Sequence, residues 1–314
     1  MLVGRSHWCD APEALDAPVL TAPHAHMPGD GADPRAIDDV ARALARTGKA
    51  LSSVDAQRLA DLRPDLILTQ DDGPAGAADL APVRRVAADL RASGRASPTI
   101  LGLNPHTLED VLDDLIRIGQ ATGLEAPATG AALRLHQRLL DAQSHVNPYD
   151  DGPVVGFLAW TDPLVVAGHW TVQMIERAGG RHPLNPTRAP DDCGAAAGLQ
   201  QGARRARGSF GVTPGELGAT MPAWLVIAPC GLGLEASWRA VSAIAQEPWF
   251  RSLPAVRRGR VAMVDGDRMF NRPGPRLAEA FEWLVSWVQD RPDLAPAGFP
   301  WRAWTVDAVE SGRR

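Results

Sequence analysis

The amino-acid sequence predicts an α/β protein built from two lobes joined by one long helix. Two observations predict this fold class: segments of the same kind recur in both halves, and an amphipathic helix lies between them. The repeated segment is a helix, an Asp or Pro, a short apolar strand and a polar or Gly/Pro-rich tip, as in AQRLADLRPDLILTQDDGP and PGELGATMPAWLVIAPCGLG. Periodicity leaves one alternative open, a single continuous α/β domain in which the middle helix is another crossover.

The middle helix is predicted over residues 126–145. Its apolar residues recur every three or four positions and so share one face; they are Ala128, Ala132, Leu135, Leu139, Ala142 and Val146. About 20 helical residues span about 30 Å, which is the width of one lobe. We therefore expect an N-terminal lobe at 1–125, a linker helix at 126–147 and a C-terminal lobe at 148–314. The strand tips of both lobes are expected to face a shared ligand cleft.

Composition narrows the classes of function. The chain has 314 residues, of which 45% are hydrophobic and 22% charged, as in soluble globular proteins. Its net charge is -5, from 37 acids and 32 bases, and no basic run is long enough to follow a nucleic-acid backbone. No apolar run approaches the roughly 18 residues of a membrane span. Nucleic-acid binding and membrane insertion are therefore not expected.

The amino terminus and the cysteines bear on localisation. The opening MLVGRSHWCDAPEA lacks the basic and apolar regions of a signal peptide. The three cysteines are far apart and lack CxxC spacing, which favours a reducing compartment over a disulfide framework. We therefore expect a cytoplasmic protein, or a periplasmic one if the true start lies upstream.

Capping and turn signals mark the elements of the first half. Asp33 is expected to cap a helix whose first residue is Pro34, and Thr107 and Asp110 form a predicted capping box. LILT, residues 66–69, reads as a buried strand because its apolar residues are consecutive. The expected helices are 34–46, 55–63, 80–92 and 108–121, and the expected strands are 66–69 and 98–103.

Similar capping and composition signals predict the elements of the second half. Thr213, Pro214 and Glu216 predict a capped helix start. Residues 186–211 are poor in large apolar residues and are predicted to be an exposed, mobile insertion. Strands are expected at 154–160, 224–229 and 260–264, and helices at about 171–180 and 276–288.

Candidate site residues of the first half follow predicted strands. Leu2 and Val3 resemble a strand end, so the cluster that follows, with His7, Trp8 and Cys9, would lie where α/β sheets bind ligands. His7 and Cys9 alone do not complete a metal site. Asp71 follows LILT, either as part of a functional acidic pair with the next residue or as a solvated turn.

Two further histidine positions are ambiguous from the sequence. His24 and His26 form an HxH pair, which can chelate a metal ion or lie in a solvated loop. His106 is expected to belong to the start of the following helix and not to the chemistry of the protein.

In the second half, Trp160 is at the tip of a predicted strand and His169–Trp170 are at a helix start. Aromatic walls with one polar group suit a large planar ligand. The alternative is that both indoles are core residues and His169 caps its helix.

Several strings in order carry a resemblance to a known family. They are GRSHWCDAP, RPDLILTQ, HTLEDVLDDLIRIGQATG, GHWTVQMIERAGG, IAPCG, LPAVRRGRVAMVDG and RPGPRL. Over most of its length the chain resembles the vitamin B12 solute-binding proteins of ABC transporters, within the group that binds corrinoids, haem and iron chelates. The resemblance implies two Rossmann-like lobes bridged by one rigid helix, with the ligand held between them.

The chain departs from this pattern at four places. Relatives begin with a strand and a helix upstream of the position of Leu2, so the first strand-helix unit is missing from the expected lobe. They carry Glu at the position of Trp8, and a cysteine-containing loop where this chain has residues 71–74. The insertion around Cys193 is also foreign to the pattern.

The resemblance implies a ligand, a set of site residues and a partner. The ligand is cobalamin or a related corrinoid, bound without catalysis, and an ABC permease is the implied partner. The implied cleft residues are His7, Trp8, Asp71, Trp160, His169, Trp170, Cys230 and Arg272. Trp160 and Trp170 are expected to pack on the corrin, and His169 or His7 to reach the cobalt or a side-chain amide. The alternatives are a haem or ferric siderophore binder and a Cys/His-dependent enzyme.

Overall fold

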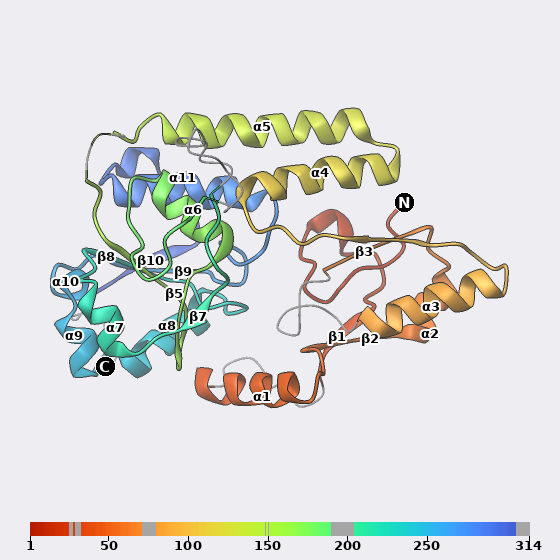
Figure 1. Cartoon of the computed structure of the whole chain (residues 1–314), viewed down its shortest axis with the longest axis horizontal. Helices are drawn as coiled ribbons and strands as arrows, with labels where there is room; N and C mark the ends of the chain where they lie inside the picture. Colours follow the sequence, from red (N-terminus) through yellow and green to blue (C-terminus); the bar gives the residue numbers. More distant parts are fainter. Residues whose placement is uncertain are drawn as a thin grey trace. The chain divides into compact units, whose positions relative to one another are not determined.

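We describe a computed structural model of the whole chain (Figure 1). The structure describes residues 1–24, 28, 33–70, 80–147, 149, 151–189 and 204–305. Contacts divide the chain into two compact units, residues 1–104 and 105–314. Both units combine helices and strands, as the sequence predicts.

The first unit holds two short sheets in its described residues. Strands β1 and β2 pair antiparallel, and β3 and β4 pair parallel. A small core forms around the buried residues Leu59, Val83, Val86 and Leu90. The elements are η1 (Pro12–Ala14), β1 (Thr21–Pro23), α1 (Pro34–Arg46), β2 (Ser52–Val54), α2 (Ala56–Leu62), β3 (Leu66–Thr69), α3 (Leu80–Ala92) and β4 (Thr99–Gly102).

Two sequence predictions for the first unit are wrong in part. LILT is a strand, β3, but it is not buried, and Leu68 is 45% exposed. Among the described residues, β3 has only β4 as a hydrogen-bonded neighbour, so its side chains are only partly buried by neighbouring elements. Leu2 and Val3 lie in no strand, and Leu2 is 56% exposed. The nearest pairing is at Arg5, whose carbonyl accepts the Leu20 N–H at 2.8 Å.

The second unit contains one six-stranded sheet, in the order β10-β9-β8-β5-β6-β7. Its three central strands, β5, β8 and β9, are parallel, and the outer pairs are antiparallel. The strands are β5 (Val155–Thr161), β6 (Leu164–Val166), β7 (Phe210–Gly211), β8 (Trp224–Ile227), β9 (Val261–Val264) and β10 (Trp301–Trp304). The helices are α4 (Leu108–Thr122), α5 (Glu125–Gln143), α6 (His169–Arg177), α7 (Pro214–Ala219), α8 (Leu234–Ile244), α9 (Pro248–Ser252), α10 (Pro254–Arg257), α11 (Arg276–Val288) and η3 (Pro292–Leu294).

Helices cover both faces of this sheet. Successive strand residues point to opposite faces, so Trp224 and Val226 join the core under α4, α5, α6 and α11, whereas Leu225 and Ile227 join the core under α7 to α10. Every residue of β8 and β9 is buried. This burial explains why both strands are continuous apolar runs in the sequence.

The long middle helix is α5, and it packs against α4 and α11 within the second unit (Figure 1). Its side chain Arg138 pairs with Glu282 of α11 at 2.6 Å. The boundary between the two units lies between residues 104 and 105, whereas the sequence predicts that the N-terminal lobe ends at residue 125. A linking role for α5 stays a prediction.

The predicted helix starts are confirmed. Thr107 and Asp110 form a capping box at α4, and Thr213 and Glu216 form one at α7. Asp33 accepts a hydrogen bond from the Arg35 N–H at the start of α1.

The segment 186–211 is only partly described. Residues 190–203, including Cys193, lie outside the described residues. In the described flanks Thr187 is 2% exposed and residues 210–211 form β7 beside β6, but most of the other residues are exposed, Arg205 and Arg207 among them. Backbone hydrogen bonds between Arg188 and Arg205 hold the two flanks together, and a mobile insertion at this place stays a prediction.

Candidate functional site

The site is built on the carboxyl ends of the three parallel strands. Because β5, β8 and β9 run in the same direction, the segments that follow them leave the same edge of the sheet. Trp160 lies near the end of β5, Cys230 follows β8 and Arg272 follows β9. The sheet therefore brings these three predicted site residues to one edge.

Backbone contacts hold these loops against one another. The Cys230 N–H donates to the Ala159 carbonyl at 3.0 Å. The Asn271 side-chain amide donates to the carbonyls of Ala228 and Gly266, at 2.9 and 2.8 Å. A Cβ at Gly266 would lie 2.1 Å from the Pro229 carbonyl oxygen, so only glycine permits this approach of the two loops.

The start of α6 contacts the loops at this edge of the sheet through Trp170. The indole Nε1 of Trp170 donates to the Phe270 carbonyl, in the loop after β9, at 2.6 Å. The Trp170 ring also stacks on His169, with ring centroids 5.8 Å apart and planes 27° apart. Trp160, His169 and Trp170 are all half-buried.

Charged groups complete this edge. The Arg272 guanidinium pairs with Asp267 at 2.5 Å. Burial raises the pKa of Asp265, although the Asp267 and Arg268 N–H groups donate to its carboxylate. Although Cys230 is exposed as a residue, desolvation of its sulfur and then the charge of Asp267 raise the pKa of the thiol.

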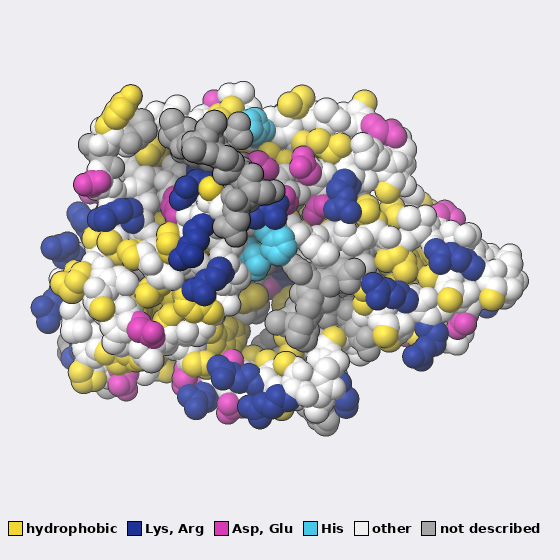
Figure 2. Space-filling model, viewed as in Figure 1, with side chains coloured by type: hydrophobic (Ala, Val, Ile, Leu, Met, Phe, Trp, Pro, Cys, Tyr) yellow, Lys and Arg dark blue, Asp and Glu magenta, His cyan; other side chains and the backbone are white. Residues whose placement is uncertain are grey.

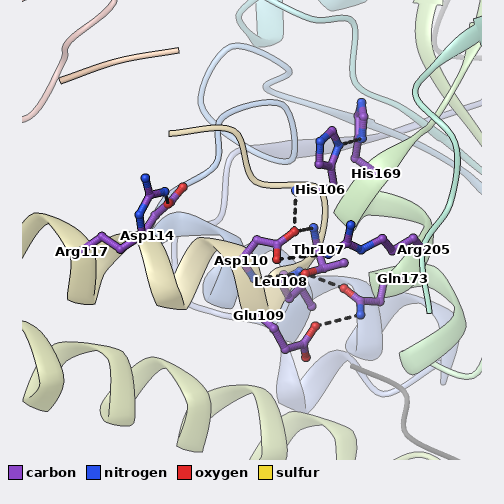
Figure 3. Close-up of polar contacts among 10 residues, drawn as sticks. All are labelled: His106, Thr107, Leu108, Glu109, Asp110, Asp114, Arg117, His169, Gln173 and Arg205. Atoms are coloured by element: carbon purple, nitrogen blue, oxygen red, sulfur yellow. Dashed lines mark hydrogen bonds and ion pairs between the residues drawn. The ribbon is translucent and has the colours of Figure 1, made fainter. Parts of the chain in front are cut away.

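A pair of histidines was missed by the sequence analysis. His106 Nδ1 lies 3.0 Å from His169 Nδ1, and Figure 3 shows the two rings facing each other. The expectation that His106 belongs to a helix start is met by its backbone, since its N–H donates to Asp110 Oδ2 at 2.9 Å. Its ring, however, reaches a residue 63 positions away, which no local pattern signals.

Two arginines, Arg205 and Arg207, lie close to the segments that carry this histidine pair. Arg205 lies 3.9 Å from Asp110, and the Arg207 carbonyl accepts the His169 N–H at 3.0 Å. The Arg207 guanidinium lies over the Phe210 ring at 4.6 Å. Figure 2 shows histidine side chains at the surface beside a group of Lys and Arg side chains. Imidazole and guanidinium groups thus share one surface.

His7 and Trp8 belong to the first unit. His7 Nδ1 lies 2.6 Å from Thr21 Oγ1, and the His7 N–H donates to the same oxygen at 3.0 Å. Trp8 is 46% exposed and lies beside the His7 ring. Asp71 and His26 lie outside the described residues. A ligand-binding role for each of these residues stays a prediction.

The described residues contain neither a cluster of metal-ion ligands nor a helix suited to span a membrane. In this part of the chain no group of three or more His, Cys, Asp or Glu side chains has the arrangement of a metal-ion site. No described helix has the length and apolar character needed to cross a membrane.

Comparison with known proteins identifies the fold. No protein-family model matches the chain. No curated protein matches it either. Solved structures do match. The periplasmic heme-binding protein BhuT, in complex with two hemes, is 21% identical with a TM-score of 0.61, over 94% of this chain and 90% of that chain.

Two other solved structures also match, and the name of one of them gives a second ligand, vitamin B12. An ABC transporter substrate-binding protein from Listeria monocytogenes EGD-e is 15% identical with a TM-score of 0.58, over 92% of this chain and 91% of that chain. The periplasmic vitamin B12-binding protein BtuF of Vibrio cholerae is 19% identical with a TM-score of 0.50, over 76% of this chain and 79% of that chain. The chain has the bilobal α/β fold of the periplasmic binding proteins.

Proposed function

We propose that this chain is a non-catalytic binding protein for a metal tetrapyrrole, with cobalamin or a related corrinoid as its ligand. The observations that carry the proposal are the stacking of two half-buried rings, His169 and Trp170, beside the loop after β9 and the position of the half-buried Trp160 near the carboxyl end of β5 in the same sheet. Indole faces pack well on a flat macrocycle, and imidazole nitrogen is a common ligand of its metal.

The choice of a corrinoid rests on the order of the sequence strings that resemble vitamin B12 solute-binding proteins. The fold supports this choice without deciding it, because similar structures include a heme-binding protein and a vitamin B12-binding protein. In this proposal Trp160 and Trp170 contact the corrin, and His169 approaches the cobalt. Delivery of the ligand to an ABC permease is the proposed biological role.

Haem is the second candidate ligand, and a separate observation favours it. Arg205 and Arg207 are exposed next to the histidine pair. Haem carries two propionates, and guanidinium groups bind carboxylates through paired hydrogen bonds. An anionic ferric siderophore would use the same arginines but would need no aromatic wall.

The alternative of a thiol enzyme has less support. A nucleophilic cysteine needs a lowered thiol pKa and a base within hydrogen-bonding distance. Burial raises the pKa of Cys230, and among the described residues no histidine hydrogen-bonds to its sulfur. The proposal therefore gives Cys230 a lining role.

A titration of the purified chain tests the proposed function. Aquocobalamin, cyanocobalamin and haemin are added in turn and followed by calorimetry and by the visible spectrum. Saturable binding of a cobalamin at micromolar affinity or better supports the first ligand. Binding of haemin alone supports the second, and the absence of binding to all three contradicts the proposal. Blocking of the thiols should leave the affinity unchanged, whereas a thiol-dependent turnover would favour the enzyme.

A further inference from the structure

The second unit has a hollow at the amino-terminal edge of its sheet, opposite the strand ends that build the candidate site. Its lining includes Pro153 before β5, Trp224 at the start of β8 and Arg260 before β9. The volume of the hollow is about 490 Å³. Binding sites for small molecules measure about 300–1,000 Å³. The hollow is therefore large enough for a small organic ligand.

Close contacts hold the walls of this hollow together. The connection between α5 and β5 meets the end of α6 at Gly152, where a Cβ would lie 1.6 Å from the Gly179 carbonyl oxygen. Only glycine permits this approach. Arg181 Nε donates to the Gly152 carbonyl at 2.8 Å, and Gln289 Nε2, just after α11, donates to the Ala178 carbonyl at 2.8 Å. Walls from three distant parts of the sequence are thus fixed to one another.

Three charged side chains line the hollow, those of Asp151, Arg260 and Asp290. In the part of the chain that the structure describes, none of the three side chains forms an ion pair or a hydrogen bond. The Arg260 guanidinium lies over the buried Trp224 ring, 4.3 Å from its centroid. The hollow therefore presents one positive and two negative groups that no described residue neutralises.

Asp290 occupies a position where helix stability favours other residues. It follows the last residues of α11 with a φ of 55°. This left-handed position after a helix is usually taken by Gly and sometimes by Asn. A carboxylate there also faces the negative end of the helix dipole, which favours cations. Natural proteins tend to break such local rules at functional sites, so Asp290 is better explained by binding than by stability.

The pattern of charge disfavours a simple ion as the ligand. An inorganic anion would meet the two carboxylates, and a metal cation would meet the guanidinium of Arg260. Among the described residues no group of three or more His, Cys, Asp or Glu side chains could hold a metal ion. A ligand with two cationic groups and one carboxylate would instead pair with all three side chains through charge-assisted hydrogen bonds.

We propose that this hollow is a second binding site, and that its ligand is a basic amino acid such as lysine or arginine. The ligand carboxylate pairs with Arg260, and its two cationic groups pair with Asp151 and Asp290. The C-terminal ends of α6 and α11 add partial negative charge beside the cationic groups. The site lies at the opposite edge of the sheet from the chelate site and does not depend on the proposed function.

Calorimetric titration tests the proposal. L-lysine and L-arginine are titrated into wild type, together with two analogues of lysine that each lack one charged group. Cadaverine lacks the carboxylate, and 6-aminohexanoate lacks the α-ammonium group. The same titrations are made on Asp151→Asn, Asp290→Asn and Arg260→Gln. Asp113→Asn is the matched control, because Asp113 is an exposed residue of α4 outside the lining. Thermal unfolding of each variant checks folding.

Wild type and Asp113→Asn should bind lysine saturably, with a Kd of about 1 mM or lower. Both analogues should bind more weakly than lysine. Asp151→Asn and Asp290→Asn should each weaken lysine binding about fivefold or more, because each leaves one cationic group without a carboxylate. Asp290→Asn should nevertheless unfold at the same temperature as wild type or higher. Arg260→Gln should weaken the binding of lysine but not of cadaverine, which has no carboxylate to pair.

Absence of saturable binding of both amino acids to wild type would overturn the proposal. Wild-type lysine affinity in Asp151→Asn or Asp290→Asn would overturn it as well. An equal loss in Asp113→Asn would contradict it, because the effect would then come from the overall charge of the protein. A lower unfolding temperature of Asp290→Asn would also contradict it, because the carboxylate would then have a structural role.

Discussion

The six-stranded sheet of the second unit and the two short sheets of the first differ in how fully their strands are buried. Helices cover both faces of the central strands of the second unit, and Leu225 of β8 is fully buried. In the first unit, Leu68 of β3 is 45% exposed. The comparison teaches that the loops after β5, β8 and β9 rest on a well-packed frame, which suits a site whose side chains need fixed positions.

The largest expected effect is a difference in stability loss between two leucine-to-alanine variants, one in β8 of the second unit and one in β3 of the first. Leu225→Ala should lower the free energy of unfolding of the second unit by about 2–5 kcal/mol, because it leaves a cavity in a packed core. Leu68→Ala should change stability by about 0.5 kcal/mol or less, because its side chain is already half in water.

Tryptophan fluorescence during urea unfolding measures this contrast. Nine of the ten tryptophans lie after residue 105, so the signal reports mainly on the second unit. Circular dichroism at the same urea concentrations follows the whole chain. Equal losses in the two variants would contradict the difference in burial.

A second expected effect concerns the loops at the site edge. Gly266→Ala should destabilise the second unit by about 1–3 kcal/mol, because its Cβ would lie 2.1 Å from the Pro229 carbonyl oxygen. Gly274→Ala is the matched control, since a Cβ there meets no atom within 4 Å. Urea unfolding of both variants measures the difference, and equal stability would show that the two loops do not pack as described.

The buried His182 of the second unit predicts a pH dependence. Burial lowers the pKa of His182, whose Nδ1 lies 2.9 Å from the Val155 carbonyl oxygen. Because the unfolded chain then binds the proton more tightly than the folded chain, stability is full above the usual histidine pKa of 6.5 and falls as the pH drops below it.

His182→Asn tests this assignment. Asparagine keeps a donor for the Val155 carbonyl but does not titrate, so the pH slope of stability between about 7 and 5 should become shallower. Unfolding by urea at a series of pH values measures the slope. An unchanged slope would mean that other groups cause the acid sensitivity.

The smallest expected effect tests how α5 is attached to the second unit. The pair of Arg138 and Glu282 is partly exposed, so a double-mutant cycle with Arg138→Ala and Glu282→Ala should give a coupling of about 0.2–1 kcal/mol. The coupling should shrink at high salt. A coupling of zero at low salt would leave apolar packing as the attachment of α5.

Elements set by local signals could be predicted from the sequence. The capping boxes at Thr107 and Thr213 need only residues three positions apart, and both are present. The strands β8 and β9 were found because burial on both faces requires continuous apolar runs. The edge strand β10 was missed, because its pairing with β9 depends on tertiary contact.

Features that depend on neighbours distant in sequence could not be predicted. The apolar run of β3 reads as buried, but its burial depends on strands and helices that the run itself does not specify. The meeting of His106 and His169 depends on α4 and α6 packing together through Gln173. The predicted site residues that follow β5, β8 and β9 did reach one edge, because parallel strands fix the direction of the chain.

The most direct test of the central claim, that the edge of the second unit's sheet holds the chelate, is ligand affinity after removal of its indoles. Trp160→Ala and Trp170→Ala, separately and together, are titrated with aquocobalamin, cyanocobalamin and haemin. Trp249→Ala, a partly buried indole on the other core of the same unit, is the control. The account predicts a loss of affinity in the first two variants, a larger loss in the double variant and none in the control. Unchanged affinity in the folded double variant would contradict it.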